Sequence, residues 1–582
     1  MRAERAAKMR RSTIQYREPL RPKLTSREVT ACACLAAATI LIYFRTFAYD
    51  FVAYDDDYFV YLNPVIQAGL KASGVAWAFG LRLGNWHPLT WISYLIDRQL
   101  FGMHAGGFHA VNVLLHAASS VVLFVALFRM TGRTWRCAIV AAVFALHPLH
   151  VESVAWVSER KDVLSTLLEM IGLLLYVRYV DRPTTRRLLQ LCTAFGCAVM
   201  AKPMVITFPV ILLLLDIWPL QRIAWPPRWP EARRLVIEKI PLLLISLIAS
   251  VLTVIAQKAY GTVASLQSIP LSTRLANAVT GYAVYLKQSV WPSNLAVLYP
   301  TAPPAPGAAT VAMIVLLILT TAVVIFGRRR PYLVTGWLWY LVMLAPVIGL
   351  VQVGAQSRAD RYMYVPLVGV TFAVVWLIGD WIAGHAAWQK AAAVAAAAII
   401  VALGVGAWRQ IGYWKDSRTL FEHTLAVTQN NFIMTNNLGV VLARAGDDRA
   451  AMVQYAKAIA MNPDYAEAQG NLGNVMLRAR LVDSARPLLE KAVRLKPEFP
   501  MAQLDLGIVE ASSGNFQSAI AHLNEALRMT PEDPEVHSNL CYALQHVGRI
   551  DEAISECKQA LQLRPNYPDA QFNLQNALAA KP

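Results

Sequence analysis

The stretch VTACACLAAATILIYFRTF (Val29–Phe47), followed by FVAYDDDY (Phe51–Tyr58), decides the fold class. An apolar helix of about 20 residues is long enough to cross a bilayer once. The three carboxylates Asp55, Asp56 and Asp57 follow it within a few residues, so we expect them at a membrane surface. Adjacent carboxylates repel one another, which raises the pKa of one of them and suits it to act as a base. A solvated acidic loop is the alternative interpretation.

The composition excludes a soluble protein. The chain has 582 residues, of which 56% are apolar and only 16% are charged, and its mean hydropathy is +0.40. We therefore predict an all-α, polytopic membrane helix bundle with a soluble region attached. The net charge of +17 does not indicate nucleic acid, because the basic residues cluster beside apolar runs. The seven cysteines form no CxxC pair, which argues against a zinc or thioredoxin-like site.

The distribution of basic residues predicts the topology. Residues 1–28 carry nine Lys/Arg against three acids and form a predicted cytoplasmic basic tail. A signal peptide is the rival interpretation, but the following apolar run is too long for one. We predict a transmembrane domain over 29–410 with eleven spans, which are Val29–Phe47, His109–Arg129, Cys137–Leu146, Val163–Val180, Leu188–Met200, Met204–Pro219, Ile240–Ala256, Val311–Phe326, Leu333–Val351, Val365–Trp381 and Ala391–Trp408. The segment Leu275–Tyr299 is left as an outer interfacial or re-entrant helix; if it crossed, the count would be twelve and the C-terminal region would change sides.

The C-terminal region, 411–582, carries a repeat of 34 residues that starts at about residue 432. The recurring positions are Pro463, Pro497, Pro531 and Pro565; Leu438, Leu472, Leu506 and Leu540; Ala451, Ala485, Ala519 and Ala553; and Ala458, Ala492, Ala526 and Ala560. Small residues where two helices cross, and a proline that ends each pair, are typical of tetratricopeptide (TPR) repeats. The segments Trp414–Thr428 and Pro568–Leu578 are expected to flank and cap the solenoid. This topology places the repeats on the outer side.

Polar residues that are rare beside so much lipid collect on the predicted outer face. They are Asp55, Asp56 and Asp57; His87; His147, His150 and Glu152; Glu159, Arg160, Lys161 and Asp162; Lys202; and Arg358, Asp360 and Arg361. Carboxylates combined with Arg and Lys suit chemistry on a lipid-linked phosphate. Cations hold the phosphate leaving group while a carboxylate deprotonates an acceptor hydroxyl.

These motifs resemble the transmembrane-and-TPR family of protein O-mannosyltransferases, in its bacterial branch. The resemblance is carried by Phe51–Asp57, by NWHPLTW (Asn85–Trp91), by HPLHVESV (His147–Val154), by ERKD (Glu159–Asp162) and by ADRYMY (Ala359–Tyr364), followed by TPRs. It implies a GT-C glycosyltransferase fold, a polyprenyl-phosphate sugar donor and TPRs outside the cytosol. The family's acidic pair maps onto Asp55 and Asp56.

The resemblance and the chemistry together predict site roles. Either Asp55 or Asp56 is the catalytic base, and the cations that contact the donor phosphate are Arg160, Lys161, Lys202 and Arg361. A salt bridge to Asp162 or Asp360 is the alternative role for the two arginines. The residues expected to position substrates are Asp57, His87, His147, His150 and Glu152.

No resident metal or other cofactor is expected. Asp55 and Asp57 also read as a DxD divalent-cation motif, and His147, His150 and Glu152 as metal ligands, but Pro148 interrupts the helix that would align the two histidines. We retain both as alternatives.

In the repeats, amides recur at Asn437, Asn471, Asn539 and Asn573, with Asp505 in the remaining repeat. They resemble the asparagine ladder of cytosolic O-linked glucosaminyltransferase, which implies a groove that binds a peptide backbone. Asparagine is also common at this position in other TPRs. Cys541 and Cys557 face one another within one repeat; an oxidising periplasm could join them, but we expect two reduced core residues.

The sequence thus predicts a multi-pass protein of the bacterial inner membrane with a cytoplasmic N-terminus and a periplasmic TPR domain. It would move a sugar, with mannose as the candidate, from a polyprenyl-phosphate donor to Ser/Thr of an exported protein that the TPR groove recruits. Two alternatives remain open. One is a membrane-anchored TPR scaffold with a degenerate enzyme domain, and the other is a lipid-carrier glycosyltransferase in surface polysaccharide synthesis.

Overall fold

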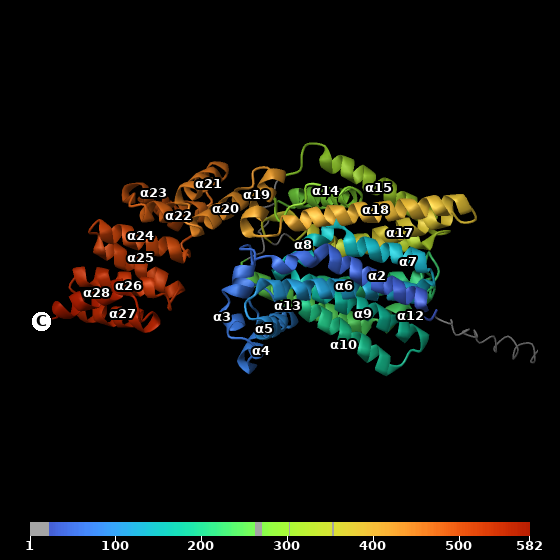
Figure 1. Cartoon of the computed structure of the whole chain (residues 1–582), viewed down its shortest axis with the longest axis horizontal. Helices are drawn as coiled ribbons and strands as arrows, with labels where there is room; N and C mark the ends of the chain where they lie inside the picture. Colours follow the sequence, from blue (N-terminus) through green and yellow to red (C-terminus); the bar gives the residue numbers. More distant parts are fainter. Residues whose placement is uncertain (1–21, 262–269, 302, 352–353, 582) are drawn as a thin grey trace, which may run out of the picture. The chain divides into compact units, whose positions relative to one another are not determined.

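The computed structural model describes residues 22–261, 270–301, 303–351 and 354–581, and the predicted basic tail over 1–28 lies largely outside these ranges. The described chain is almost entirely helical (Figure 1). It divides into two compact units between Leu420 and Phe421, whereas the predicted domain boundary was at 410/411. We call them the membrane unit and the TPR unit.

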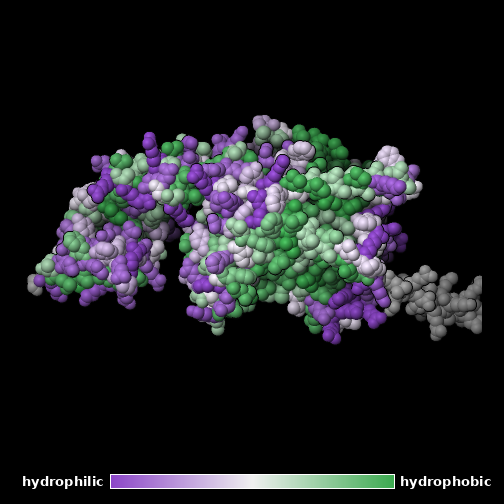
Figure 2. Space-filling view, viewed as in Figure 1, coloured by the Kyte–Doolittle hydropathy of each residue, from purple (hydrophilic) through white to green (hydrophobic). Residues whose placement is uncertain are grey.

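Long helices build the membrane unit. Their bounds are α2 Ser26–Tyr43, α6 Ala105–Thr131, α7 Thr134–Leu146, α9 Arg160–Asp181, α10 Thr185–Ala201, α11 Phe208–Ile217, α13 Ile240–Ala259, α14 Leu271–Val290, α15 Ala308–Gly327, α16 Pro331–Leu344, α17 Pro366–Trp381 and α18 Ala386–Gly412. The face in view is hydrophobic along the middle of these helices and hydrophilic near their ends (Figure 2). This pattern suits a multi-pass membrane protein, since lipid solvates the apolar middle and water the polar ends.

Six described helical segments are long and apolar enough to cross a membrane, and a seventh is added if the bent pair Thr134–Leu146 and Pro148–Ala155 counts as one span. Three shorter apolar helical segments also occur, at Pro203–Ile217, Pro331–Leu344 and Pro366–Trp381. All eleven predicted spans are wholly or largely helical. The test of length and apolar composition, however, identifies only six or seven described helices that could cross a membrane. The span count therefore stays a prediction. α14 includes residues 275–290 of the predicted interfacial segment Leu275–Tyr299, and it is not among these six helices.

Short elements join the long helices at one end of the membrane unit. They are the helical turns η1 Phe44–Ala48, η2 Asp57–Tyr61, η3 Pro148–His150, η4 Val157–Glu159, η5 Pro203–Thr207 and η6 Asp360–Met363; the helices α3 Pro64–Gln67, α4 Ala72–Ala78, α5 Pro88–Phe101 and α8 Val151–Ala155; and the antiparallel strands β1 Tyr299–Pro300 and β2 Gln356–Arg358. α12 Trp229–Glu238 lies between α11 and α13. Proline begins many of these elements, because its fixed φ suits a first helical turn and its missing N–H ends the preceding helix.

Close helix packing in the membrane unit depends on small residues. α16 and α17 approach at Gly336 and Gly369, where a Cβ on either residue would meet the carbonyl of the other. Backbones can come this near only where both side chains are absent. The contact fixes α17 and so the position of η6 just before it.

The TPR unit consists of helix pairs repeated at the predicted spacing of 34 residues. The pairs are α20 Phe432–Arg444 with α21 Asp448–Met461, α22 Ala466–Arg478 with α23 Val482–Leu495, α24 Pro500–Ser512 with α25 Phe516–Met529, and α26 Pro534–His546 with α27 Ile550–Leu563; α28 Pro568–Ala579 follows them. α19 Ser417–Val427 precedes the pairs and contains the division between the units. The eight repeated alanines are all fully buried, as expected for positions where two helices cross.

The fourth repeat departs from the others at one packing position. In the first three repeats a glycine lies under a larger side chain: Gly439 under Tyr455, Gly473 under Leu489, and Gly507 under Leu523. The equivalent pair in the fourth repeat is Cys541 and Cys557, which form a disulfide with Cα atoms 5.4 Å apart. The prediction of two reduced cysteines is therefore wrong. The reason is geometric: the position where one helix needs no side chain brings two Cβ atoms within bonding reach.

Candidate active site

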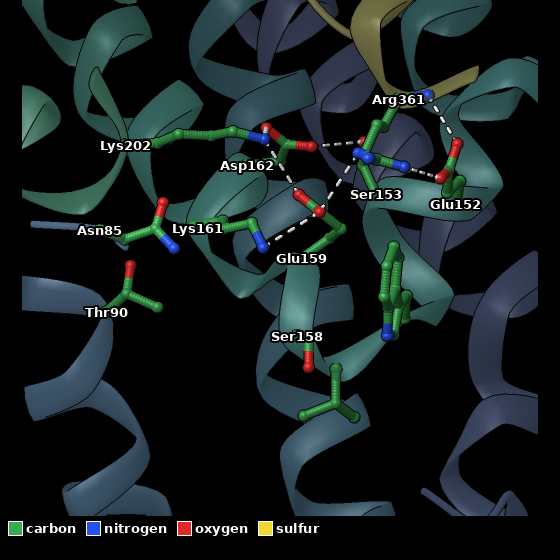
Figure 3. Close-up of polar contacts among 12 residues, drawn as sticks. Asn85, Thr90, Glu152, Ser153, Ser158, Glu159, Lys161, Asp162, Lys202 and Arg361 are labelled. Atoms are coloured by element: carbon green, nitrogen blue, oxygen red, sulfur yellow. Dashed lines mark hydrogen bonds and ion pairs between the residues drawn. The ribbon is translucent and has the colours of Figure 1, made fainter. Parts of the chain in front are cut away.

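Six charged side chains, three positive and three negative, meet in the membrane unit (Figure 3). Lys202 Nζ lies 2.6 Å from an Asp162 oxygen and 3.0 Å from a Glu159 oxygen, and Lys161 Nζ lies 3.1 Å from the other Glu159 oxygen. Arg361 forms an ion pair with Glu152, and its Nε lies 3.3 Å from Glu159. We call these six residues, Glu152, Glu159, Lys161, Asp162, Lys202 and Arg361, the charge cluster.

The local sequence explains why these charges stand where apolar helices stop. α10 ends at Ala201, and Lys202 precedes Pro203 at the start of η5. The Arg361 backbone N–H also donates to Glu152 at 2.8 Å, which joins η6 to α8. Residues separated by more than 200 positions are thereby held together. Of the polar residues expected together on the outer face, the structure brings Glu152, Lys161, Lys202 and Arg361 into one cluster, whereas Asp56, His150 and Arg160 bond to other partners.

The cluster contains three carboxyl groups and three basic side chains, so its formal charges balance; burial raises the pKa of Asp162 to about 7. Burial alone lowers the pKa of Lys202, but the Asp162 and Glu159 carboxylates raise it above its ordinary value, so the lysine stays charged. Side chains of Lys161, Lys202 and Arg361 keep about an eighth of their surface exposed. The cations are therefore paired but accessible from one side, which suits contact with a charged ligand.

The acidic triplet divides into residues with different surroundings. Asp56 is fully buried, and it accepts hydrogen bonds from the Val52 N–H at 2.9 Å, from the Ser158 N–H at 2.8 Å and from the Ser158 hydroxyl. Both of its oxygens are thus occupied. Asp57 is buried at the start of η2, where it accepts from the Tyr58 N–H at 3.1 Å.

Asp55 differs because its partly exposed carboxylate has no hydrogen bond or ion pair to a described residue. Burial raises the pKa of Asp55 to about 7; the Lys161 and Arg361 charges oppose the rise, and the Glu159 and Asp56 charges add to it. A carboxyl group with a pKa near neutrality, close to cations and without a partner, can accept a proton from a ligand hydroxyl.

His87 lies close enough to the charge cluster to be affected by its charges. Burial, then the positive charges of Lys161 and Lys202, lower the pKa of His87 to about 3, so its ring is neutral at physiological pH. Its Nδ1 is buried without a hydrogen-bond partner among the described residues. A neutral imidazole with a free nitrogen is suited to hydrogen-bond an uncharged ligand group, in line with its predicted positioning role.

Arg160 lies outside the charge cluster, which differs from its predicted phosphate contact. Its guanidinium is fully buried, forms an ion pair with Asp97 at 2.7 Å, and donates to Asn112 and to the Phe108 carbonyl. The predicted alternative, a bridge to Asp162 or Asp360, is also wrong. A buried arginine whose donors are all directed to the protein holds helices together, here α5, α6 and α9.

His147 and His150 are likewise buried within the fold rather than placed in the charge cluster. His147 Nε2 lies 3.2 Å from the Ser289 carbonyl, and His150 Nδ1 lies 2.6 Å from the Phe144 carbonyl. His150 also packs against Tyr364 and His116. The described residues contain no group of three or more His, Cys, Asp or Glu that could hold a metal ion.

Sequence analysis missed three residues that set this geometry: Asp97, Asn112 and Ser158. Each is the partner of a residue that it did select, namely Arg160 or Asp56. The only signal for Ser158 is its position just before Glu159. Asp97 and Asn112 lie within otherwise ordinary helices and carry no signal in the sequence.

The four repeated asparagines lie half-buried on the first helices of the TPR pairs and on α28. Asn471 donates to Asn436 at 2.9 Å, and Asn573 to the Ser538 carbonyl at 3.3 Å, so both link neighbouring repeats. Asn539 donates to the Glu535 carbonyl at 2.9 Å, and Asn437 accepts from Asn436. Their peptide-binding role stays a prediction.

Comparisons with known proteins find TPR family models in the TPR unit and several relatives of this chain. Two tetratricopeptide-repeat family models match residues 449–500, 477–545 and 510–578. The Mus musculus protein O-mannosyl-transferase TMTC1 is 33% identical over 218 residues, and the Homo sapiens TMTC1 is 33% identical over 162 residues. The chain carries TPR repeats and is similar to TMTC proteins over the matched residues. The matches cover 34% and 26% of this chain but only 23% and 18% of the relatives' own length.

The chain is similar to further proteins. It is 29% identical over 170 residues to the Drosophila melanogaster protein O-mannosyl-transferase Tmtc2, with 28% of this chain and 18% of that protein covered. Among solved structures, the TPR protein YrrB shares 24% identity, with 27% of this chain and 82% of that chain covered and a TM-score of 0.25.

Proposed function

We propose that this chain is a membrane glycosyltransferase that moves a sugar, with mannose as the candidate, from a polyprenyl-phosphate donor to a Ser/Thr hydroxyl of a protein. The observation that carries the proposal is the unpartnered Asp55 carboxylate, with a pKa of about 7, close to the charges of Lys161 and Arg361. The names of the relatives, all protein O-mannosyl-transferases, support the reaction class.

The proposed step transfers one proton and exchanges one bond. The acceptor oxygen attacks the anomeric carbon of the sugar while its hydroxyl proton passes to Asp55. The bond between that carbon and the phosphate oxygen breaks, and its electron pair leaves with the lipid phosphate. The cations Lys161, Lys202 and Arg361 stabilise the phosphate charge that develops, and His87 is placed to hydrogen-bond the sugar.

Asp55 rather than Asp56 is the proposed base. The Asp56 oxygens already accept three hydrogen bonds, so a substrate hydroxyl would have to displace one of them. Asp56 instead positions the loop that carries Asp55 against Ser158. Asp57 is proposed to help hold the same loop, and this mechanism requires no metal ion.

The proposed location is the bacterial inner membrane, with the charge cluster and the TPR unit both on the periplasmic side. The Cys541–Cys557 disulfide supports a non-cytosolic TPR unit, because such bonds persist in oxidising compartments. The TPR unit is proposed to recruit the acceptor protein, in keeping with its repeat class.

The test compares D55N with D50N in a strain that lacks the chromosomal copy. Asp50 is an exposed carboxylate five positions away and is the matched control. Removal of a general base is expected to lower transfer about 100-fold or more, so mass spectrometry should find hexose on Ser/Thr peptides with wild type and D50N but not with D55N. Unchanged glycopeptides in D55N would refute the proposal. Altered surface polysaccharide with unchanged glycopeptides would favour the polysaccharide alternative.

The pH dependence supplies a second readout. Only the ionised Asp55 can accept the proton, so kcat/KM should fall about tenfold for each pH unit below about 7 and level off above it. A profile without this break in wild-type protein would contradict the assignment of Asp55.

A further inference from the structure

A polar cavity of about 460 Å³ lies at the opposite end of α6 from the charge cluster. The position of α6 shows this separation: Arg160, whose neighbours Glu159 and Lys161 belong to the charge cluster, donates to the carbonyl of Phe108 near the start of α6, and Thr131 at the end of α6 lines the cavity. α6 has 27 residues and is therefore about 40 Å long. The proposed transferase chemistry makes no use of this cavity.

Three arginines and one carboxylate line the cavity. Arg136 pairs with Asp380 at 2.8 Å. Arg133 and Arg329 also line it, and neither side chain forms an ion pair or hydrogen bond with a described residue. The cavity therefore holds more positive than negative charge, and two guanidinium groups are available to a ligand. Guanidinium groups match phosphate oxygens in geometry and charge.

A buried hydroxyl group adds evidence for a ligand. Tyr332 lines the cavity and is only 4% exposed; its hydroxyl makes no hydrogen bond of normal geometry with a described residue, and burial, then the neighbouring Asp380 carboxylate, raise its pKa to about 12. A ligand oxygen that accepted a hydrogen bond from this hydroxyl would give it a partner of normal geometry. The aromatic rings of Trp218 and Trp376 form further parts of the wall.

Two helices also begin at the cavity. Arg133 precedes the first residue of α7, and Pro331 is the first residue of α16, and both line it. The unpaired N–H groups and the dipole at a helix N-terminus favour an anion. Arginine is common at cytoplasmic helix ends in membrane proteins, and this alone would explain exposed arginines. It would not explain why they surround a cavity that also contains a buried tyrosine hydroxyl.

Exposed tryptophans indicate the depth of the cavity in the bilayer. Trp135, beside Arg136, is 67% exposed, and Trp381, beside Asp380, is 68% exposed and packs against Trp388. Exposed tryptophan is enriched at the level of the lipid headgroups. The cavity thus lies where a headgroup phosphate would be found.

From these observations we infer that the cavity lined by Arg133, Arg136, Arg329 and Tyr332 is a binding site for a phosphate group. The depth of the site favours the headgroup of an anionic phospholipid over free phosphate as the source. In the bound state the two unpaired arginines contact phosphate oxygens, and the Tyr332 hydroxyl donates to one of them.

The test is native mass spectrometry of the full chain in non-ionic detergent with three probes: phosphatidylglycerol, phosphatidylcholine and inorganic phosphate. We expect retained phosphatidylglycerol, and weaker binding of phosphatidylcholine because its choline is repelled. The R133Q/R329Q variant should weaken phosphatidylglycerol binding about tenfold or more, since charge-assisted hydrogen bonds are lost. The R233Q/R234Q variant removes equal charge from exposed residues of α12, outside the cavity, and should bind as wild type does.

The Y332F variant guards against a folding artefact. Because the nearby Asp380 carboxylate is 42% exposed and already pairs with Arg136, removal of the Tyr332 hydroxyl should leave the melting temperature nearly unchanged and weaken phosphatidylglycerol binding about three- to tenfold. Competition by millimolar inorganic phosphate, or phosphate binding without lipid binding, would assign free phosphate as the source and keep the site. Equal binding by wild type, R133Q/R329Q and Y332F, or binding of none of the probes, would overturn the proposal.

Discussion

Substitution of Asp56 by alanine should destabilise the membrane unit, although the residue stands beside the proposed base. The Asp56 side chain is fully buried and accepts from two backbone N–H groups, those of Val52 and Ser158, and from the Ser158 hydroxyl. D56A leaves both N–H groups without an acceptor. Each buried donor left unpaired costs about 1–3 kcal/mol, and the hydroxyl bond adds about 1 kcal/mol, so we expect a loss of about 4 kcal/mol.

The size of this loss should follow the number of acceptors that remain. D56N keeps one acceptor oxygen, so it should cost about half as much as D56A. S158A removes the hydroxyl and keeps the backbone donor, so it should cost about 1 kcal/mol. D50N, at an exposed position, should leave stability within about 0.5 kcal/mol of wild type.

The assay is denaturant-induced unfolding of the detergent-solubilised full chain, followed by tryptophan fluorescence. A double-mutant cycle completes it: D56A/S158A should cost less than the sum of the two single changes, because they share a hydrogen bond. If D56A unfolds at the same denaturant concentration as D50N, or if the two changes add fully, Asp56 does not clamp the loop to Ser158 and the assignment of roles within the triplet fails.

Three further predictions concern other parts of the chain. Burial raises the pKa of Asp505 to about 7, although hydrogen bonds from Asn474 lower it, so the folded state binds the proton more tightly than the unfolded state. The free energy of unfolding of the TPR unit should therefore fall by up to about 1.4 kcal/mol per pH unit as the pH rises from about 4 to 7. The D505N variant should show no such slope in melting curves recorded over this pH range. C541A/C557A should destabilise the TPR unit by about 3 kcal/mol, the value expected for a closed loop of about 16 residues, and the two thiols of wild-type protein should react with a maleimide only after reduction. R160M should cost about 3–5 kcal/mol in denaturant unfolding because it leaves the Asp97 carboxylate buried and unpaired, whereas R160M/D97L should recover most of that loss.

The repeat architecture could be predicted almost to the residue, because a 34-residue period sets both helices of every pair. The helix starts Phe432, Ala466, Pro500 and Pro534 follow this period. The disulfide could have been recognised by the same period, since Cys541 occupies the position of Gly439. Small core residues are common at facing positions of a repeat, which favours reduced cysteines; the close backbone approach at the Gly439 position instead favours the disulfide.

The candidate site was predictable only as a set of charges near helix ends. Asp55 and Asp56 are adjacent in sequence and identical in chemistry, so only the turn that directs one toward Ser158 and leaves the other partly exposed can separate them. Arg160 was assigned to the phosphate because it stands between Glu159 and Lys161. One position along a helix rotates a side chain by about 100°, which directs this guanidinium to Asp97 on α5 and away from both neighbours.

The cations of the charge cluster are all paired with carboxylates, whereas two arginines of the cavity are not paired with any described residue. Salt should therefore affect ligand binding differently at the two sites. In the charge cluster every cation already has a carboxylate partner, so a donor phosphate at Arg361 or Lys202 exchanges one anion for another. At the arginine-lined cavity, a phosphate gives Arg133 and Arg329 their first partners. Added salt screens a newly formed exposed pair more than an exchange between partly buried ones. Raising the salt concentration should therefore weaken phosphatidylglycerol binding at the cavity more steeply than it raises the KM for the sugar donor, and parallel changes in the two would show that ion pairing within the charge cluster does not govern donor binding.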